Sequence, residues 1–135
     1  VTGLRVIFAK PLGTGTSLSY ALWLSSETLR GAISDAVSGG PELAAPFSPI
    51  PGHWYHVAYT FDDSTHQQAL YVDGIQIAIG LVTKSISYDT RPLLLGRDTN
   101  SFLGGSIDEA SIYDRALTDL EIASIYEAGP AGKRL

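Results

Sequence analysis

Residues 53–74 read HWYHVAYTFDDSTHQQALYVDG, and this stretch decides the fold. Its first ten residues alternate strictly, so that two sets of side chains point to opposite faces of an extended strand. One set is Tyr55, Val57, Tyr59 and Phe61, and the other is Trp54, His56, Ala58 and Thr60. Large groups on both faces predict a central strand over residues 53–62. The following Asp73-Gly74 pair predicts a two-residue hairpin turn, because both of its positions require a positive φ.

Strand patterns continue on both sides of this stretch. We expect strands over residues 5–10, 19–25, 29–34, 93–95 and 105–113, and a hairpin of two strands over residues 69–79. Residues 37–52 contain four prolines, which predicts a long loop or an edge segment. After the hairpin turn, Ile75, Ile77, Ile79 and Leu81 alternate with small or polar residues, which predicts a strand with one buried face. Short strands separated by turns are typical of an all-β domain.

One helix is expected near the carboxyl end, over residues 119–128. Thr118 is placed to be its N-cap, and Glu121 three residues later completes a capping box. Gly129 fits the position after the helix, and Pro130 stops it. We therefore expect one β-sandwich domain over residues 1–129, with a short tail at residues 130–135.

Composition excludes several classes of function. The 135 residues are 44% hydrophobic and 17% charged, enough apolar material for a sizeable core. The net charge is −5, and the nine Lys and Arg residues form no basic stripe, so we expect no nucleic-acid partner. No apolar run approaches the roughly 18 residues of a spanning helix, so we expect no membrane insertion. Cysteine is absent, which excludes disulfides and thiolate metal sites.

The acids of the sequence do not form a catalytic pattern. Asp108 and Glu109 are adjacent, and strand alternation would place them on opposite faces, which argues against a paired acid and base. No glutamate has an aspartate two residues later, the spacing of retaining glycosidases of similar fold. The motifs of serine and zinc hydrolases are also absent. We expect no enzyme, and glycoside hydrolysis is the least favoured function.

Sugar binding needs an aromatic platform beside a few polar groups. Tyr88 is the best exposed aromatic candidate, because its neighbours are polar. The polar loop that contains Arg97, Asp98 and Asn100 follows a strand and would supply rim contacts, although an ordinary turn explains the same residues. The tryptophans are more typical of a core.

An ordered set of motifs closely resembles the laminin-G-like, or pentraxin-like, domains of the concanavalin A-type jelly-roll superfamily. The resemblance runs over residues 6–129. Its motifs, in order, are WYHVAYTFD (54–62), LYVDG (70–74), LLGR (94–97), GSIDE (105–109) and IYDRALT (112–118) followed by Glu121 and Ile122. The resemblance implies an antiparallel two-sheet jelly-roll sandwich. It also implies a non-catalytic binding or adhesion module that recognises carbohydrate or glycoconjugate, at the surface of or outside a bacterial cell.

The resemblance implies roles for several residues. Asp108 would contribute to one structural Ca²⁺, and the alternative is that it accepts backbone or arginine hydrogen bonds. Framework roles are implied for Trp54, His56, Asp73, Gly74, Glu109, Thr118 and Glu121. Such domains usually begin with further strands, which would come from preceding residues or by donation from another chain. The alternative function is therefore a structural or assembly domain of a surface protein or fibre, in contact with other protein chains.

Overall fold

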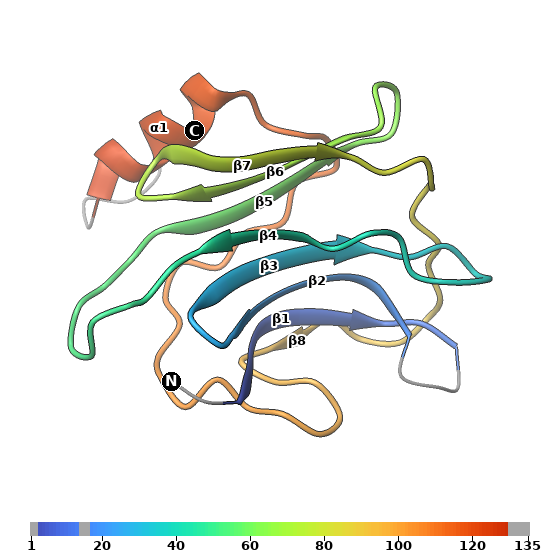
Figure 1. Ribbon diagram of the computed structural model, residues 1–135, viewed down its shortest axis with the longest axis horizontal. Coiled ribbons are helices and arrows are strands. Elements are labelled where there is room, and N and C mark those ends of the chain that lie inside the picture. Colours follow the sequence, from blue (N-terminus) through green and yellow to red (C-terminus); the bar gives the residue numbers. More distant parts are fainter. Residues whose placement is uncertain (1–2, 14–16, 130–135) are drawn as a thin grey trace.

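The computed structural model describes residues 3–13 and 17–129 and contains two antiparallel sheets packed face to face, with one short helix (Figure 1). The larger sheet has the strand order β4-β3-β2-β1-β8, and the smaller has the order β5-β6-β7. The elements are β1 (Leu4–Pro11), β2 (Leu18–Ser25), β3 (Thr28–Ile33), β4 (Leu43–Pro46), β5 (Val57–Asp62), β6 (Gln67–Val72), β7 (Ile75–Leu81), β8 (Leu94–Leu95) and α1 (Asp119–Ala128). The predicted all-β sandwich with a carboxyl-terminal helix is confirmed. The predicted tail at residues 130–135 lies outside the described residues.

The main core lies between the two sheets. Leu22 and Leu29 from the five-stranded sheet pack against Leu70 from the three-stranded sheet, and all three are almost completely buried. Gly31 on β3 faces the ring of Tyr59 so closely that a Cβ atom there would lie 2.4 Å from a ring carbon. The Tyr59 hydroxyl donates to Oε1 of buried Gln68 at 2.8 Å. A glycine is therefore required where β3 faces the Tyr59 ring of the other sheet.

The predicted hairpin turn joins β6 to β7. Asp73 and Gly74 have φ values of 50° and 79°, as a type I′ turn requires. Asp73 also ties the turn to the approach of β5, because its Oδ1 accepts from the His56 N–H at 2.9 Å and its own N–H donates to the His56 carbonyl at 2.8 Å. The turn prediction is confirmed.

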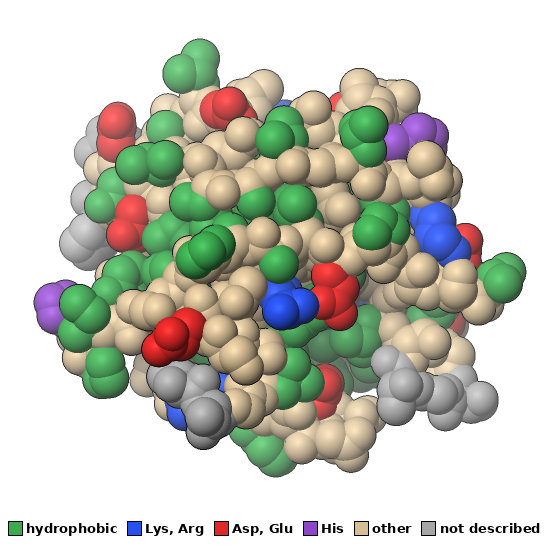
Figure 2. Space-filling model, viewed as in Figure 1, with side chains coloured by type: hydrophobic (Ala, Val, Ile, Leu, Met, Phe, Trp, Pro, Cys, Tyr) green, Lys and Arg blue, Asp and Glu red, His purple; other side chains and the backbone are tan. Residues whose placement is uncertain are grey.

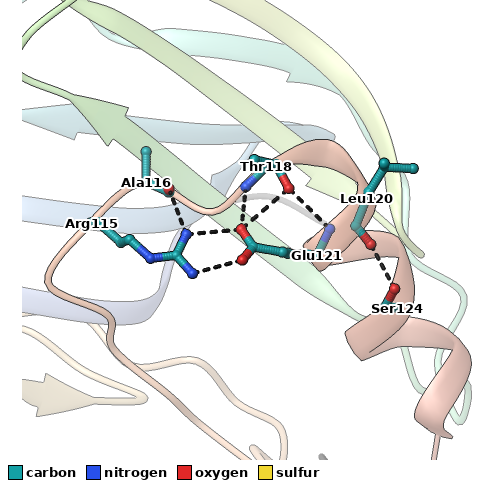
Figure 3. A network of polar contacts seen from close by, with 6 residues as sticks. All are labelled: Arg115, Ala116, Thr118, Leu120, Glu121 and Ser124. Carbon is teal, nitrogen blue, oxygen red and sulfur yellow. Dashed lines mark hydrogen bonds and ion pairs between the residues drawn. The ribbon is translucent and has the colours of Figure 1, made fainter. Parts of the chain in front are cut away.

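The predicted capping box at the start of α1 is also confirmed. The Thr118 hydroxyl accepts from the Glu121 N–H, and the Glu121 carboxylate accepts from the Thr118 N–H at 2.8 Å (Figure 3). Arg115 extends this network with two hydrogen bonds to the same carboxylate, at 2.9 and 2.6 Å. Ile122, only 1% exposed, then packs with Tyr71 on the outer face of the three-stranded sheet. Among the described residues, no helix is long and apolar enough to cross a membrane.

The structure corrects the prediction for residues 53–62. The strand begins at Val57, and β5 pairs only with β6 in the described chain, so it is an edge strand and not a central one. Trp54 lies before the strand and is 68% exposed, so its expected place in the core is wrong. Large side chains on both faces of this stretch reflect a core contact on one side and the covering helix on the other.

Two further strand predictions fail. The apolar residues of β7 were expected to be buried, but Ile75, Ile79 and Leu81 are 68%, 51% and 67% exposed. Helix α1 contacts the turn at Gly74, but these three side chains remain exposed beyond it. Residues 105–113 form no strand, because no described strand lies beside them to complete a ladder. Glu109 there has a φ of 50°, so strand alternation does not describe how its side chain and that of Asp108 are directed.

Candidate functional site

The outer face of the five-stranded sheet carries a second apolar cluster. Alternation along β2 directs Leu22 into the main core, so Ala21 and Trp23 lie on the opposite face. There Ala21 packs with Val6 and Ala9 of β1, and the half-buried Trp23 packs against this cluster. This face therefore presents apolar side chains on the side of the sheet away from the other sheet.

A polar loop after β8 folds back toward this face. Its base is fixed by backbone hydrogen bonds, from Gly96 N–H to the Ile7 carbonyl at 2.7 Å and from Leu103 N–H to the Gly96 carbonyl at 2.8 Å. Its tip is held by Asp98, whose Oδ1 accepts from the N–H groups of Asn100 and Ser101 at 2.7 and 2.6 Å. In such a turn the side chain takes the place of a backbone acceptor.

A groove with a volume of about 400 Å³ lies between this loop and the sheet. We call it the outer-face groove. Val6, Ala21 and Trp23 line its apolar part, and Glu42, Asp98 and Asn100 are among the polar residues that line it. Figure 2 shows the molecule hollowed on its lower half, with hydrophobic side chains in the hollow and charged side chains beside it. An apolar floor with a few convergent polar groups is the usual composition of a small-ligand site.

Glu42 reaches this groove through an ion pair. Arg30 lies directly opposite Trp23 in the β2–β3 register, so both side chains occupy the same face. Its Nη1 is 2.8 Å from Oε2 of Glu42, in the proline-containing segment before β4. The guanidinium is therefore already engaged, while the carboxylate borders the groove. No local sequence pattern predicts that Glu42 lines the groove, because its position depends on this contact between β3 and the segment before β4.

The structure brings together only some of the residues that were predicted to bind a ligand. Asp98 and Asn100 both line the outer-face groove, whereas Arg97 turns aside and stacks over the Phe102 ring, with 5.6 Å from Cζ to the ring centroid. Tyr88 is 65% exposed, as expected, but it packs edge-on against Tyr20, which alternation assigns to the inner face of β2. Sequence reasoning preferred Tyr88 as the aromatic platform, and the groove contains Trp23 instead.

Asp108 has a local role. Its Oδ1 accepts from the Glu109 N–H at 2.8 Å, so it does act as a backbone acceptor, the alternative to metal binding. Calcium needs about six to eight oxygen ligands. The described residues contain no group of three or more His, Asp or Glu side chains arranged to hold an ion. Calcium binding by Asp108 therefore stays a prediction, and any such site would need backbone carbonyls or water as further ligands.

Another carboxylate far from the groove is strongly perturbed for structural reasons. Hydrogen bonds from the Arg115 guanidinium, and then from Thr118, lower the pKa of Glu121 to about 2. Figure 3 shows these three residues pointing toward one another at the start of α1. This network fixes the entry of the chain into the helix and does not line the outer-face groove.

Comparison with known proteins supports the fold. The family model described as "Concanavalin A-like lectin/glucanases superfamily" matches residues 2–123. A heptameric SAP-like pentraxin from Limulus polyphemus is similar with a TM-score of 0.60 and 18% identity, over 98% of this chain and 67% of that chain. An S-layer domain-containing protein from Clostridium thermocellum matches with a TM-score of 0.48 and 21% identity, over 93% of this chain and 64% of that one. The chain thus spans less than two thirds of this last structure's length. Comparison with curated proteins gave no match.

Proposed function

Since the chain belongs to the concanavalin A-like lectin/glucanases superfamily, we propose that it is a non-catalytic module that binds carbohydrate in the outer-face groove. The observation that carries this proposal is the meeting of Trp23 with Asp98 and Asn100 in one groove. A half-buried indole offers a flat apolar surface with a fixed orientation. The Asn100 amide and the carboxylates beside it supply donors and acceptors for sugar hydroxyls.

The charges around the groove favour a neutral sugar. The carboxylates of Glu42 and Asp98 both border it, and the neighbouring Arg30 already pairs with Glu42 at 2.8 Å. A uronic or sialic acid would bring a third carboxylate to this site, whose described lining contains no Lys or Arg. Like charges that are placed together cost binding energy, so the groove discriminates against acidic glycans.

The test is a glycan array, followed by calorimetric titration of the best neutral oligosaccharide. Trp23→Ala should weaken binding at least tenfold, because loss of a central aromatic contact typically costs more than about 1.4 kcal/mol. Tyr88→Ala is the matched control, since it removes an exposed aromatic residue on the other face and should leave the affinity unchanged. Equal affinities for the wild type and Trp23→Ala, with both proteins folded, would exclude this groove as the binding site.

Prolonged incubation with the oligosaccharide that binds best separates binding from hydrolysis. Glu42 is held by Arg30, and Oδ1 of Asp98 accepts two backbone hydrogen bonds, which supports framework roles for both carboxylates. We therefore expect no release of reducing ends after prolonged incubation with the bound oligosaccharide. Release that disappears in Glu42→Gln would instead identify a glycoside hydrolase.

The proposed carbohydrate binding does not depend on calcium. We expect EDTA to leave the affinity unchanged, because the proposed contacts are made by side chains of the groove. A loss of binding that added Ca²⁺ restores would assign an ion to the site.

We place the module outside the cell or at its surface, where glycan polymers are available, and labelled protein should bind to intact glycan-coated particles.

A further inference from the structure

The described lining of the outer-face groove is negative without any compensating positive side chain. Glu42 and Asp98 are its two charged residues, and its other polar residues, Ser17, Thr99, Asn100 and Ser101, are neutral. The whole chain has a net charge of −5, so its long-range field also attracts cations. The charges that discriminate against an acidic glycan therefore also distinguish a neutral glycan from a positively charged one.

The charge of Asp98 is not neutralised by a neighbouring side chain. Its Oδ1 accepts from the N–H groups of Asn100 and Ser101, at 2.7 and 2.6 Å, whereas its Oδ2 accepts no hydrogen bond from the described residues. No Lys or Arg of the described chain forms an ion pair with it. The adjacent Arg97 donates instead to the Asp98 backbone carbonyl, at 3.2 Å, and stacks over the Phe102 ring. The carboxylate thus keeps one oxygen for a ligand.

Glu42 is paired on one side only. Its Oε2 is 2.8 Å from Nη1 of Arg30, and its Oε1 accepts no hydrogen bond from the described residues. Arg30 itself does not line the groove, so the ligand meets the carboxylate rather than the guanidinium. Both acidic side chains of the groove therefore have an oxygen that lacks a donor in the described chain.

An aromatic ring accompanies these two carboxylates. The half-buried Trp23 lines the same groove. Among aromatic side chains, tryptophan attracts a cation most strongly, because of the negative face of its ring system. An ammonium group has three N–H donors and no acceptor, which suits carboxylate oxygens that still lack a partner. Aromatic rings and carboxylates in one groove, without Lys or Arg in its described lining, are the composition that suits an organic ammonium ion.

We propose that the outer-face groove selects an amino sugar with an unacetylated, protonated amine. The ammonium group is held by Trp23 and by the carboxylates of Glu42 and Asp98, and Asn100 receives a sugar hydroxyl. This inference rests on the proposed carbohydrate binding and adds the chemical class of the preferred sugar. Among glycans, the order of affinity should be positively charged, then neutral, then acidic.

A glycan array with matched triplets tests this order. Each triplet presents the same sugar backbone with a hydroxyl, a free amine or an N-acetylated amine at the same ring carbon. Only the free amine is charged, and the other two forms control for hydrogen bonding and for size. In each triplet that binds, the free-amine form should bind about fivefold or more tightly than both neutral forms, because weak ion pairs and a cation–aromatic contact add together.

Variants that remove only a charge assign the preference to the groove. Asp98→Asn keeps an Oδ1 that accepts from the turn, and Glu42→Gln keeps an oxygen that accepts from Arg30. In calorimetric titration, each should lower the advantage of the amine by about two- to threefold and leave the affinity for the neutral forms unchanged. Asp63→Asn is the matched control, since it removes one charge at an exposed turn between β5 and β6 and should keep the full preference. Added salt should reduce the preference of the wild type.

The outcomes separate this inference from the proposed carbohydrate binding. If the neutral forms bind and the free-amine forms bind no more tightly, the inference is overturned and the carbohydrate site remains. The same conclusion follows if Asp98→Asn and Glu42→Gln both keep the full preference for the amine. If no triplet binds, the proposed function fails, and this inference fails with it.

Discussion

The two outer faces of the sandwich are covered by different kinds of structure. The face of the three-stranded sheet is covered by α1, which buries Ile122 against Ala69 and Tyr71. The face of the five-stranded sheet is approached by the rigid polar loop after β8, and a groove remains beside Trp23. A helix fills the surface that it covers, whereas a loop held by its own hydrogen bonds leaves room for a ligand.

This difference assigns stability to one face and binding to the other. The Tyr71 hydroxyl donates to the Asp119 carboxylate at 2.7 Å, so the helix is attached to the sheet by a polar contact as well as by packing. Desolvation and this carboxylate raise the pKa of Tyr71 to about 12. The hydroxyl therefore stays protonated, and able to donate, at ordinary pH. Variants on the two faces should accordingly change different measurements.

The largest effect should come from the helix-covered face. Ile122→Ala should lower the free energy of unfolding by about 2–5 kcal/mol, because it opens a cavity under a helix that contributes one fully buried side chain. Urea denaturation measures the change. Leu120→Ala, on the same helix but 80% exposed, should change stability by less than about 0.5 kcal/mol. Similar losses in both variants would mean that α1 is not packed as described.

The second-largest loss of stability should come from the core between the two sheets. Gly31→Ala should cost about 1–3 kcal/mol, because the new methyl group would overlap the Tyr59 ring between the sheets. Gly39→Ala is the control, since its Cβ would lie 3.6 Å from the Ser34 hydroxyl, an ordinary contact. Thermal unfolding of both variants measures the difference. A Gly31→Ala variant with unchanged stability would show that the two sheets can move apart at this position.

Local chemistry explains which parts of the fold were predictable. The Asp73-Gly74 turn and the Thr118 capping box depend on residues within four positions of one another, so their sequence patterns are sufficient. Residues 105–113 have an equally strand-like pattern, but a strand needs a partner that is distant in sequence. Alternation in β7 correctly indicates a strand, but it shows neither the bulge at Ile77 nor whether anything covers the apolar side chains.

The candidate site was predictable to the same limited extent. Asp98 and Asn100 stand out because polar residues after a strand form turns that project from a sheet. Alternation within residues 19–25 places Trp23 and Leu22 on opposite faces of the strand, but the role of Trp23 depends on a loop about 75 residues later that folds back onto its face. Glu42 reaches the groove through its pairing with Arg30, which no single segment encodes.

A smaller effect should come from the rim of the groove. Asn100→Ala should weaken sugar binding by about 1 kcal/mol, roughly fivefold, because it removes one neutral hydrogen-bonding group and leaves the apolar floor intact. Stability should change little, since the turn is held by the Asn100 backbone N–H, and the side-chain amide adds only an exposed hydrogen bond to the neighbouring Thr99 hydroxyl at 3.2 Å. Calorimetric titration beside a Thr83→Ala control, an exposed polar residue just after β7 that does not line the groove, separates a rim contact from a general loss of fold. An unchanged affinity would restrict recognition to the floor.

The smallest effect should be a pH dependence at the start of α1. Hydrogen bonds from Arg115 and Thr118 lower the pKa of Glu121 to about 2, against an unfolded value of about 4.3. A depressed pKa in the folded state adds stability that is fully present above the unfolded value and is lost as the pH falls toward 2. The melting temperature of the wild type should therefore decrease over this range more steeply than that of Glu121→Gln. Glu127→Gln removes the same charge outside the Arg115 network and should retain the wild-type slope. Because Glu121 is accessible to solvent, added salt should weaken this dependence of melting temperature on pH. If the melting temperatures of the wild type and Glu121→Gln fall equally with pH, the Arg115–Glu121–Thr118 network does not stabilise the helix-covered face.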